Sequence, residues 1–217
     1  MHKRKLLAMV VTSAITLSAA AESIAADMTY VGIHGMWTDL KDADFNVAPG
    51  TIDTEFDSGT GLGITLGRTF EAMRGELEFT ARMNDVKSHS LNGSATLPGS
   101  KGEAKSNAFM VNGYYDFVNE SSFTPYVGGG IGIANVKFDN FGVDPIPDVL
   151  NDDGTVFSYQ VMAGADVKVS DAWKLFAEYR YFRTSEVDVV TSNVTGAVDN
   201  SIAYKTNNIL VGARILF

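Results

Sequence analysis

The last eleven residues of the chain, NNILVGARILF, alternate between two kinds of side chain. Successive side chains of an extended strand point to opposite faces, so this alternation gives the strand one apolar face and one mixed face. The apolar face holds Ile209, Val211, Ala213, Ile215 and Phe217. A strand with such a face aggregates unless protein core or lipid covers it. The fold therefore has to supply one of these two covers.

The same period of two recurs in seven earlier segments, which makes eight predicted strands. These segments are MTYVGIHGMWT, GTGLGITLGRTF, RGELEFTARM, NAFMVNGYYDF, FTPYVGGGIGIANVKF, FSYQVMAGADVKV and WKLFAEYRYFR. Short connectors near residues 71–73, 119–122 and 170–172 alternate with long ones near 40–54, 87–101, 139–153 and 187–200. An up-and-down antiparallel sheet produces this alternation, and its closure removes the free edges. The sequence therefore predicts an all-β fold, an eight-stranded antiparallel up-and-down transmembrane β-barrel.

The assignment to a membrane follows from the charge on the two faces. One face collects glycine and ionisable residues, whereas the other is almost purely aliphatic and aromatic. Six ionisable residues stand near strand centres: Glu76, Glu78, Asp116, Glu178, Arg180 and Arg214. Such groups are costly in lipid but can pair with one another inside a narrow barrel, so the apolar face is predicted to be the outer one. A soluble lipocalin-like barrel, with its apolar face inward, is the alternative.

Two further expectations follow from this arrangement. The six ionisable residues should form a lumen charge network that plugs the barrel, because eight strands enclose a lumen that side chains largely fill. Aromatic residues near strand ends should form girdles at the two membrane interfaces. These aromatic residues are Trp37, Phe70, Phe117, Trp173, Tyr181 and Phe217.

The N-terminus is typical of a secretory signal peptide. A basic MHKRK segment precedes a short apolar run, and small residues follow at Ser23 and Ala25. We expect a signal peptide over residues 1–25, with cleavage after residue 25 or 26, and an outer-membrane barrel over residues 26–217. An uncleaved N-terminal anchor is the alternative, although the apolar run is short for a membrane span.

Composition excludes several classes of function. The chain has no cysteine, so it carries no disulfide, thiol nucleophile or cysteine-based metal site. The formal net charge is −9, and removal of the basic leader would make it more negative, which disfavours nucleic-acid binding. No catalytic residue, cofactor or metal site is predicted.

Glycine and histidine motifs in the strands have structural interpretations. Gly59, Gly61, Gly63 and Gly67, and again Gly128, Gly130 and Gly132, lack the following helix of a nucleotide-binding loop. Their spacing fits one strand face, where they would leave room for bulky lumen side chains. His34 is expected to face the lumen in a hydrogen-bonded structural role. His89 lies between Ser88 and Ser90 in a predicted loop, where adjacent side chains point apart, so an esterase or lipid A deacylase pair is not favoured.

Acidic residues concentrate in the long connectors. The first connector holds Asp39, Asp42, Asp44, Asp53, Glu55 and Asp57, and the third holds Asp139, Asp144, Asp148, Asp152 and Asp153. No regular calcium-ligand spacing appears, so these residues are interpreted as solvated loops whose partner would be basic or bridged by divalent cations. The long connectors carry little apolar material and no evident hairpin pattern, which predicts mobile loops.

Three stretches carry a resemblance to a known family. FTPYVGGGIGIANV, YVGIHGMW and the terminal aromatic residue resemble the bacterial outer-membrane β-barrel family of opacity-type and 25–31 kDa surface antigens, similar to OmpA- and OmpX-like eight-stranded barrels. The resemblance implies an outer-membrane location among lipid and lipopolysaccharide, and assembly by the barrel-assembly machinery. The assembly signal would be Phe217 and Ile215, although Ala213 and Ile215 stand where larger residues are common.

Three functions from different classes remain at this stage. The first is a structural, adhesive or host-interacting surface protein whose four long extracellular loops bind a host or extracellular ligand. The second is a narrow, porin-like channel. The third is an outer-membrane lipid-modifying enzyme. The first is our prediction, and a non-enzymatic role goes with it.

Overall fold

The computed structural model describes residues 28–47, 50–93, 96–143, 150–193 and 196–217, almost all of them in strands. The expected signal peptide, residues 1–25, lies outside the described residues. The strands are β1 (Thr29–Leu40), β2 (Ala43–Val47), β3 (Gly50–Phe56), β4 (Gly59–Phe70), β5 (Met73–Leu91), β6 (Ser100–Asp116), β7 (Phe123–Val143), β8 (Leu150–Lys168), β9 (Trp173–Asn193) and β10 (Gly196–Leu216). No helix among these residues is long and apolar enough to cross a membrane.

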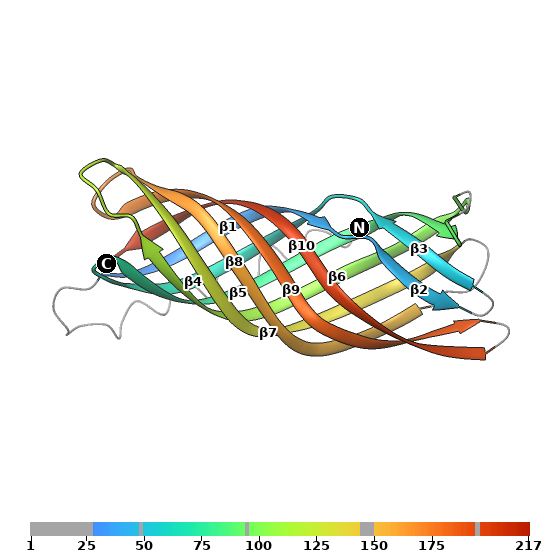
Figure 1. The fold of residues 1–217 in the computed structure, drawn as a ribbon. Helices are drawn as coiled ribbons and strands as arrows, with labels where there is room; N and C mark the ends of the chain where they lie inside the picture. The colour runs from blue at the N-terminus through green and yellow to red at the C-terminus, as the bar shows by residue number, and fades with distance from the viewer. Residues whose placement is uncertain (1–27, 48–49, 94–95, 144–149, 194–195) are drawn as a thin grey trace, which may run out of the picture.

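Eight of the strands close into an antiparallel ring (Figure 1). Consecutive members of the series β4 to β10 pair with one another, and β1 pairs with both β10 and β4. At the end of the ring, the N–H of Phe217 donates to the carbonyl of Thr29 at 2.9 Å, and the reverse bond is 3.2 Å long. The predicted eight-stranded up-and-down sheet is therefore confirmed, and every ring strand has two neighbours.

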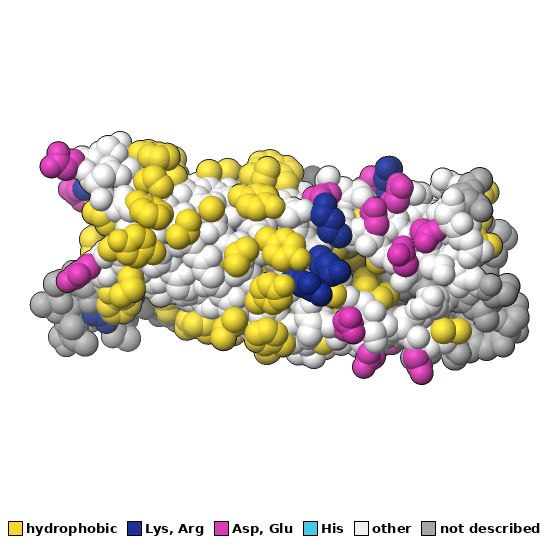
Figure 2. All heavy atoms as spheres, in the orientation of Figure 1, with side chains coloured by type: hydrophobic (Ala, Val, Ile, Leu, Met, Phe, Trp, Pro, Cys, Tyr) yellow, Lys and Arg dark blue, Asp and Glu magenta, His cyan; other side chains and the backbone are white. Residues whose placement is uncertain are grey.

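Side chains alternate across the ring wall as the sequence predicts. On β5, Glu76 and Glu78 are buried, whereas Leu77 and Phe79 are 45% and 46% exposed. The outward side chains form an apolar band at the end of the molecule that holds the short turns and the C-terminus, hereafter the short-turn end (Figure 2). Of the expected girdle residues, Trp37, Phe70, Phe117, Trp173 and Phe217 are exposed and Tyr181 is half-buried.

The opposite end, hereafter the long end, is built mostly of strands rather than loops. A strand of about 9–11 residues crosses a bilayer, yet β5 has 19 residues and β9 and β10 have 21 each. β2 and β3 form a hairpin in the first long connector, and β3 pairs with the far part of β5. The expectation that the long connectors lack a hairpin pattern is therefore wrong. Strands continue through them because they bury apolar side chains of their own.

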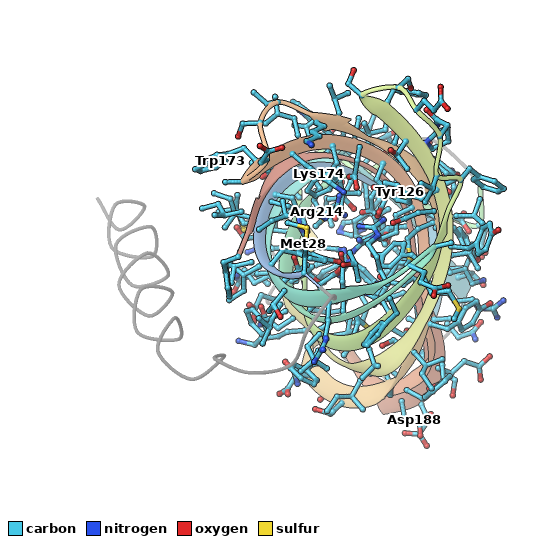
Figure 3. All side chains as sticks on the ribbon, turned by 90° about the vertical axis from the view of Figure 1, so that its left-hand side faces the viewer. Met28, Tyr126, Trp173, Lys174, Asp188 and Arg214 are labelled. Atoms are coloured by element: carbon cyan, nitrogen blue, oxygen red, sulfur yellow. The ribbon has the colours of Figure 1, made fainter. Side chains whose placement is uncertain are left out.

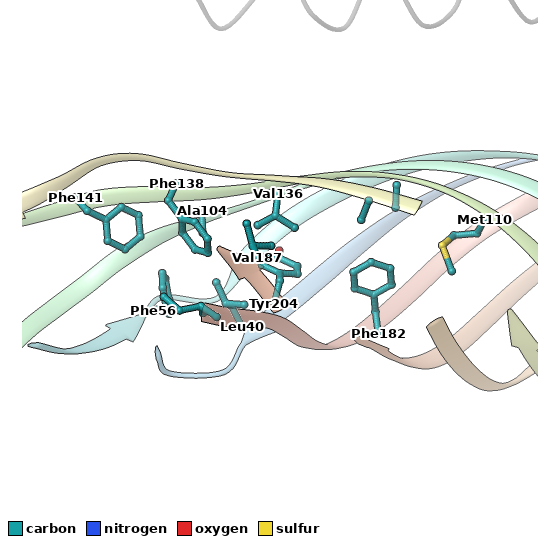
Figure 4. Close-up of a cluster of buried hydrophobic side chains, with 13 residues drawn as sticks. Leu40, Phe56, Ala104, Met110, Val136, Phe138, Phe141, Phe182, Val187 and Tyr204 are labelled. Carbon is teal, nitrogen blue, oxygen red and sulfur yellow. The ribbon is translucent and has the colours of Figure 1, made fainter. Parts of the chain in front are cut away.

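A hydrophobic core fills the long end of the ring (Figure 4). Its buried members are Leu40, Phe56, Ala104, Ala108, Met110, Ala134, Val136, Phe138, Phe141, Phe182, Val187, Ile202 and Tyr204. At the same end, Asp85, Lys87 and Asp188 point outward and are exposed. The molecule therefore has two regions along its axis. Near the short turns the interior is polar and the exterior apolar, whereas at the long end the interior is apolar and the exterior charged.

Two glycines show why small residues line the inner wall. A Cβ on Gly128 would overlap the ring of Tyr114, and a Cβ on Gly67 would overlap the ring of Tyr30. Both tyrosines are buried in the lumen. The prediction that these inward glycines leave room for bulky lumen side chains is confirmed.

Replacement of Phe138 tests the independent core of the long end. Phe138→Ala should lower the free energy of unfolding by about 3–5 kcal/mol, because it leaves a cavity among buried side chains. Limited proteolysis of the protein in lipid vesicles should show new cleavage at the long end. Phe109→Ala, which removes a lipid-facing ring, is the matched control and should leave the long end resistant. Equal resistance in both variants would show that the long end does not depend on this core.

Candidate functional site

Side chains from four strands meet in the lumen around the guanidinium of Arg180. It lies 2.7 Å from an oxygen of Glu178 and is hydrogen-bonded to Glu78. Tyr126 donates to Glu178 at 3.0 Å, and Asn112 donates to Glu78 at 3.0 Å. All these residues are buried, and the two carboxylates share the single positive charge of Arg180, with each carboxylate oxygen hydrogen-bonded inside the wall.

A second group lies nearer the short turns. Arg214 is paired with Asp166 and lies 3.5 Å from Glu76, and Tyr30 donates to the same Glu76 at 2.5 Å. Arg74 Nε donates to Asp116 at 2.9 Å. In Figure 3, Arg214 and Tyr126 point into the ring, whereas Trp173 and Asp188 lie outside it. Aromatic rings complete this group. The Cζ atom of Arg214 lies 3.9 Å from the centroid of the Phe176 ring, and the Cζ atom of Arg74 lies 4.6 Å from the centroid of the Tyr126 ring.

The structure thus places all six expected network residues in the interior. It brings Glu78, Glu178 and Arg180 into one group and Glu76 and Arg214 into the other, while Asp116 joins through Arg74. Arg74 and Asp166 also belong to this network, although the sequence analysis did not include them. The period of two could have predicted their inward position, because residues two apart on a strand share a face, as do Arg74 with Glu76 and Gly164 with Asp166.

Two buried basic residues of the lumen have few polar partners. The guanidinium of Arg82 donates to the hydroxyl of Thr80 at 2.9 Å, and its Cζ atom lies 4.2 Å from the centroid of the Phe182 ring. Arg82 forms no ion pair among the described residues. His34 is buried edge-on to Phe176, with ring centroids 6.1 Å apart, and neither of its ring nitrogens has a hydrogen-bond partner in the described part of the chain. The expected hydrogen-bonded role of His34 is therefore wrong, and its contacts are those of packing.

His89 differs from its predicted position in a loop. It lies in β5 at the long end, with its ring buried inside. Its Nε2–H donates to the carbonyl of Lys101 at 3.0 Å, which leaves Nδ1 to accept from the hydroxyl of Thr54 at 2.9 Å. Burial lowers the pKa of His89 below its ordinary value, and the bond to the Lys101 carbonyl opposes this shift. His89 therefore joins β3, β5 and β6 rather than serving a serine hydroxyl.

The outer surface of the long end is predominantly acidic. Exposed carboxylates there include Asp42, Asp44, Glu55, Asp57, Asp85, Glu186, Asp188 and Asp199. Of the acidic residues expected in the connectors, Asp144 and Asp148 lie outside the described residues. Some carboxylates have partners: Glu55 lies 3.1 Å from Lys87, and Asp53 accepts from the N–H of Gly93 at 2.5 Å. Among the described residues no group of three or more His, Asp or Glu side chains is placed to hold a metal ion.

A closed ring with a paired polar lumen and an apolar outer band defines the class as an outer-membrane β-barrel protein. A model of the outer membrane protein β-barrel domain family matches residues 7–217, and the chain belongs to this family. The protein is accordingly located in the bacterial outer membrane.

Relatives and solved structures agree with this assignment. The chain is 30% identical to outer membrane protein PagN of Salmonella typhimurium over 127 residues, 54% of this chain and 52% of PagN. It therefore spans about half the length of that relative. It is 27% identical over 190 residues, 82% of this chain, to RC1281 of Rickettsia conorii, a protein named as a candidate adhesin and covered over 75% of its length. The crystal structure of neisserial surface protein A superposes with a TM-score of 0.54 at 17% identity, covering 87% of this chain and 97% of that one, which shows the shared fold.

Removal of Arg214 tests whether the lumen charges depend on one another. Arg214→Ala should lower the free energy of unfolding by about 3–5 kcal/mol, because it leaves Glu76 and Asp166 buried with fewer cations. Urea titration of the protein in vesicles measures this loss. Lys168→Ala, which breaks the exposed pair with Asp171, is the control and should cost no more than about 1 kcal/mol. Equal small losses in both variants would contradict a coupled network.

Acidification should loosen the long end through His89. Because the folded-state pKa of His89 lies below the unfolded value, the unfolded chain takes up a proton first as the pH falls through about 6.5. The free energy of unfolding should therefore fall between pH 7.5 and 5.5 in the unmodified protein. His89→Gln should remove part of this pH dependence. An unchanged slope in the variant would mean that His89 does not contribute.

Proposed function

We propose that the protein is an adhesive, host-contacting surface protein whose binding surface is the acidic long end. The observation that carries this proposal is the extension of the ring strands beyond the apolar band, with a hydrophobic core and a charged exterior. In transmembrane barrels the short turns face the periplasm, so the long end would face the outside of the cell. The relative named as a candidate adhesin supports the same role.

The acidic surface indicates the chemistry of the partner. Exposed carboxylates on neighbouring strands repel one another and favour a basic ligand, or one bridged by divalent cations. Because the long end is built from paired strands rather than loose loops, the charges are held in fixed positions. A preorganised surface binds with a smaller entropic cost than a mobile one.

A narrow channel is less well supported by the interior. Two ion-pair groups and the stacked aromatic rings fill the membrane-level lumen, and the hydrophobic core fills the long end. We infer that these groups plug the barrel, as the ionisable strand centres suggested. Conductance across planar bilayers tests this inference, and a stable pore of large diameter would contradict it.

Charge replacement at the two ends of the barrel tests the adhesive role. Bacteria carrying Asp42→Asn with Asp44→Asn should adhere to epithelial cells less well than bacteria carrying the unmodified protein. Glu120→Gln with Asp171→Asn removes the same charge from exposed positions at the short-turn end and is the matched control. Surface levels of each variant are checked by antibody labelling. Equal adhesion in the two double variants, at equal surface levels, would contradict a binding surface at the first connector of the long end.

The proposed partners in the cell are outer-membrane lipid, lipopolysaccharide and the barrel-assembly machinery. The structure supports a special role for the C-terminus, because the backbone of Phe217 makes the last pair of hydrogen bonds that join β10 to β1. The side chains of Ile215 and Phe217 point outward and are exposed, where the machinery could contact them.

Replacement of the terminal residue tests this assembly signal. Phe217→Asp should reduce the amount of heat-modifiable barrel in the outer membrane and leave periplasmic protein open to proteolysis, with signal-peptide removal unchanged. Phe117→Asp, which changes another exposed ring at the short-turn end, is the matched control. Normal barrel levels for Phe217→Asp, or an equal loss in both variants, would show that the terminal position has no special role.

A further inference from the structure

Basic side chains form a row on the outside of the barrel at the border of the apolar band. Lys205 of β10 lies directly opposite Arg183 of β9. The N–H of Lys41, just past the end of β1, donates to the carbonyl of Lys205 at 2.9 Å. Three neighbouring chain segments thus bring Lys41, Lys205 and Arg183, hereafter the basic row, to one level. Figure 2 shows dark-blue side chains gathered between the yellow band and the magenta carboxylates.

The neighbouring outward positions place this row at the level of lipid headgroups. On β1, β10 and β9, the second outward position from the basic row toward the short turns carries a large apolar or aromatic side chain. These side chains are Trp37, Ile209 and Tyr179, which face one another in register. These side chains are 59%, 58% and 52% exposed. Tryptophan and tyrosine concentrate where the hydrocarbon meets the headgroups, so the basic row lies just beyond the hydrocarbon.

The protein itself does not neutralise the basic row. Arg183 and Lys205 form no ion pair with any described residue, and like charges directly opposite each other destabilise a strand pair. Lys41 has one exposed partner, Asp39, at 3.0 Å. Counting ion-paired groups, three cations and one carboxylate leave a surplus of two positive charges, those of Arg183 and Lys205, while the carboxylate of Asp42 also acts on Lys41 through space. A phosphate monoester carries about −1.5 to −2 at neutral pH, which matches this surplus.

A second cross-strand basic pair, unlike the basic row, is neutralised by carboxylates of the chain. Lys105 of β6 faces Lys137 of β7, also at the border of the apolar band. Asp139 lies 3.1 Å from Lys105 and 2.7 Å from Lys137, and Glu103 lies 2.5 Å from Lys105. The chain therefore supplies carboxylates to one basic pair and leaves the other open to an external anion.

We propose that the basic row binds a phosphate group of an outer-leaflet lipid, the phosphorylated glucosamine end of lipopolysaccharide. The planar guanidinium of Arg183 can hold two phosphate oxygens, and the two ammonium groups add point charges beside it. The acyl chains of the same molecule would lie along Trp37, Ile209 and Tyr179, a contact that a soluble anion could not make. This inference rests on the proposed lipopolysaccharide environment and is independent of host contact.

Binding to defined lipids tests the proposal. The purified protein in detergent is titrated with lipid A that carries its phosphates, with the same lipid A after enzymatic dephosphorylation, and with heparin as a soluble sulfated chain. Arg183→Gln with Lys205→Gln should weaken binding of phosphorylated lipid A roughly tenfold or more. Lys105→Gln with Lys137→Gln changes the net charge equally and should alter it by no more than about twofold. Heat-modifiability confirms that both variants are folded.

Each contrary outcome has a distinct meaning. If the unmodified protein binds phosphorylated and dephosphorylated lipid A equally, phosphate recognition is wrong and the proposed lipopolysaccharide partner loses its support. If it prefers the phosphorylated lipid but the Arg183 and Lys205 variant binds as tightly, the basic row is not the site. If the variant loses only heparin binding, the row serves a sulfated polysaccharide and the lipid assignment is overturned.

Discussion

Every backbone N–H and C=O within a bilayer must find a partner inside the protein, since hydrocarbon offers none. This chain meets that constraint by pairing β1 with both β10 and β4, so that no ring strand has a free edge. Closure of eight strands leaves a narrow lumen. The side chains that alternate inward must fill that lumen, and those that alternate outward must suit lipid. The lumen pairs and the apolar band both follow from this closure.

The interior changes character where the barrel leaves the membrane. Within the apolar band, burial of Arg180 is tolerated because Glu78 and Glu178 pair with its guanidinium. Burial of Arg214 is tolerated because two carboxylates and the ring of Phe176 surround its guanidinium. Beyond the band, water covers the outer wall, so polar side chains turn outward and Phe138 and Tyr204 turn inward as in a soluble protein. The same strands therefore serve two solvents along their length, and the long end is stabilised by a core of its own.

The sequence predicted the eight ring strands, their order and their inner and outer faces, because strict alternation determines each of them locally. It did not predict which inner charges meet. Arg74 reaches Asp116 and Asp166 through the stagger between strands, which alternation does not encode. It also missed β2, β3 and the long-end core. Leu40 and Phe56 are isolated apolar residues between charged neighbours, and only the pairing of distant strands brings them together with Ile202.

The central claim is that one set of strands changes from a lipid-facing to a water-facing wall along its length. The chain has no cysteine, so single spin labels can be introduced cleanly in vesicles. Labels at Leu77→Cys and Val111→Cys should collide with lipid-soluble oxygen, labels at Lys87→Cys and Asp188→Cys with a water-soluble relaxant, and a label at Val136→Cys with neither. Lipid contact at residues 87 and 188, or free access of water to residue 136, would contradict the account.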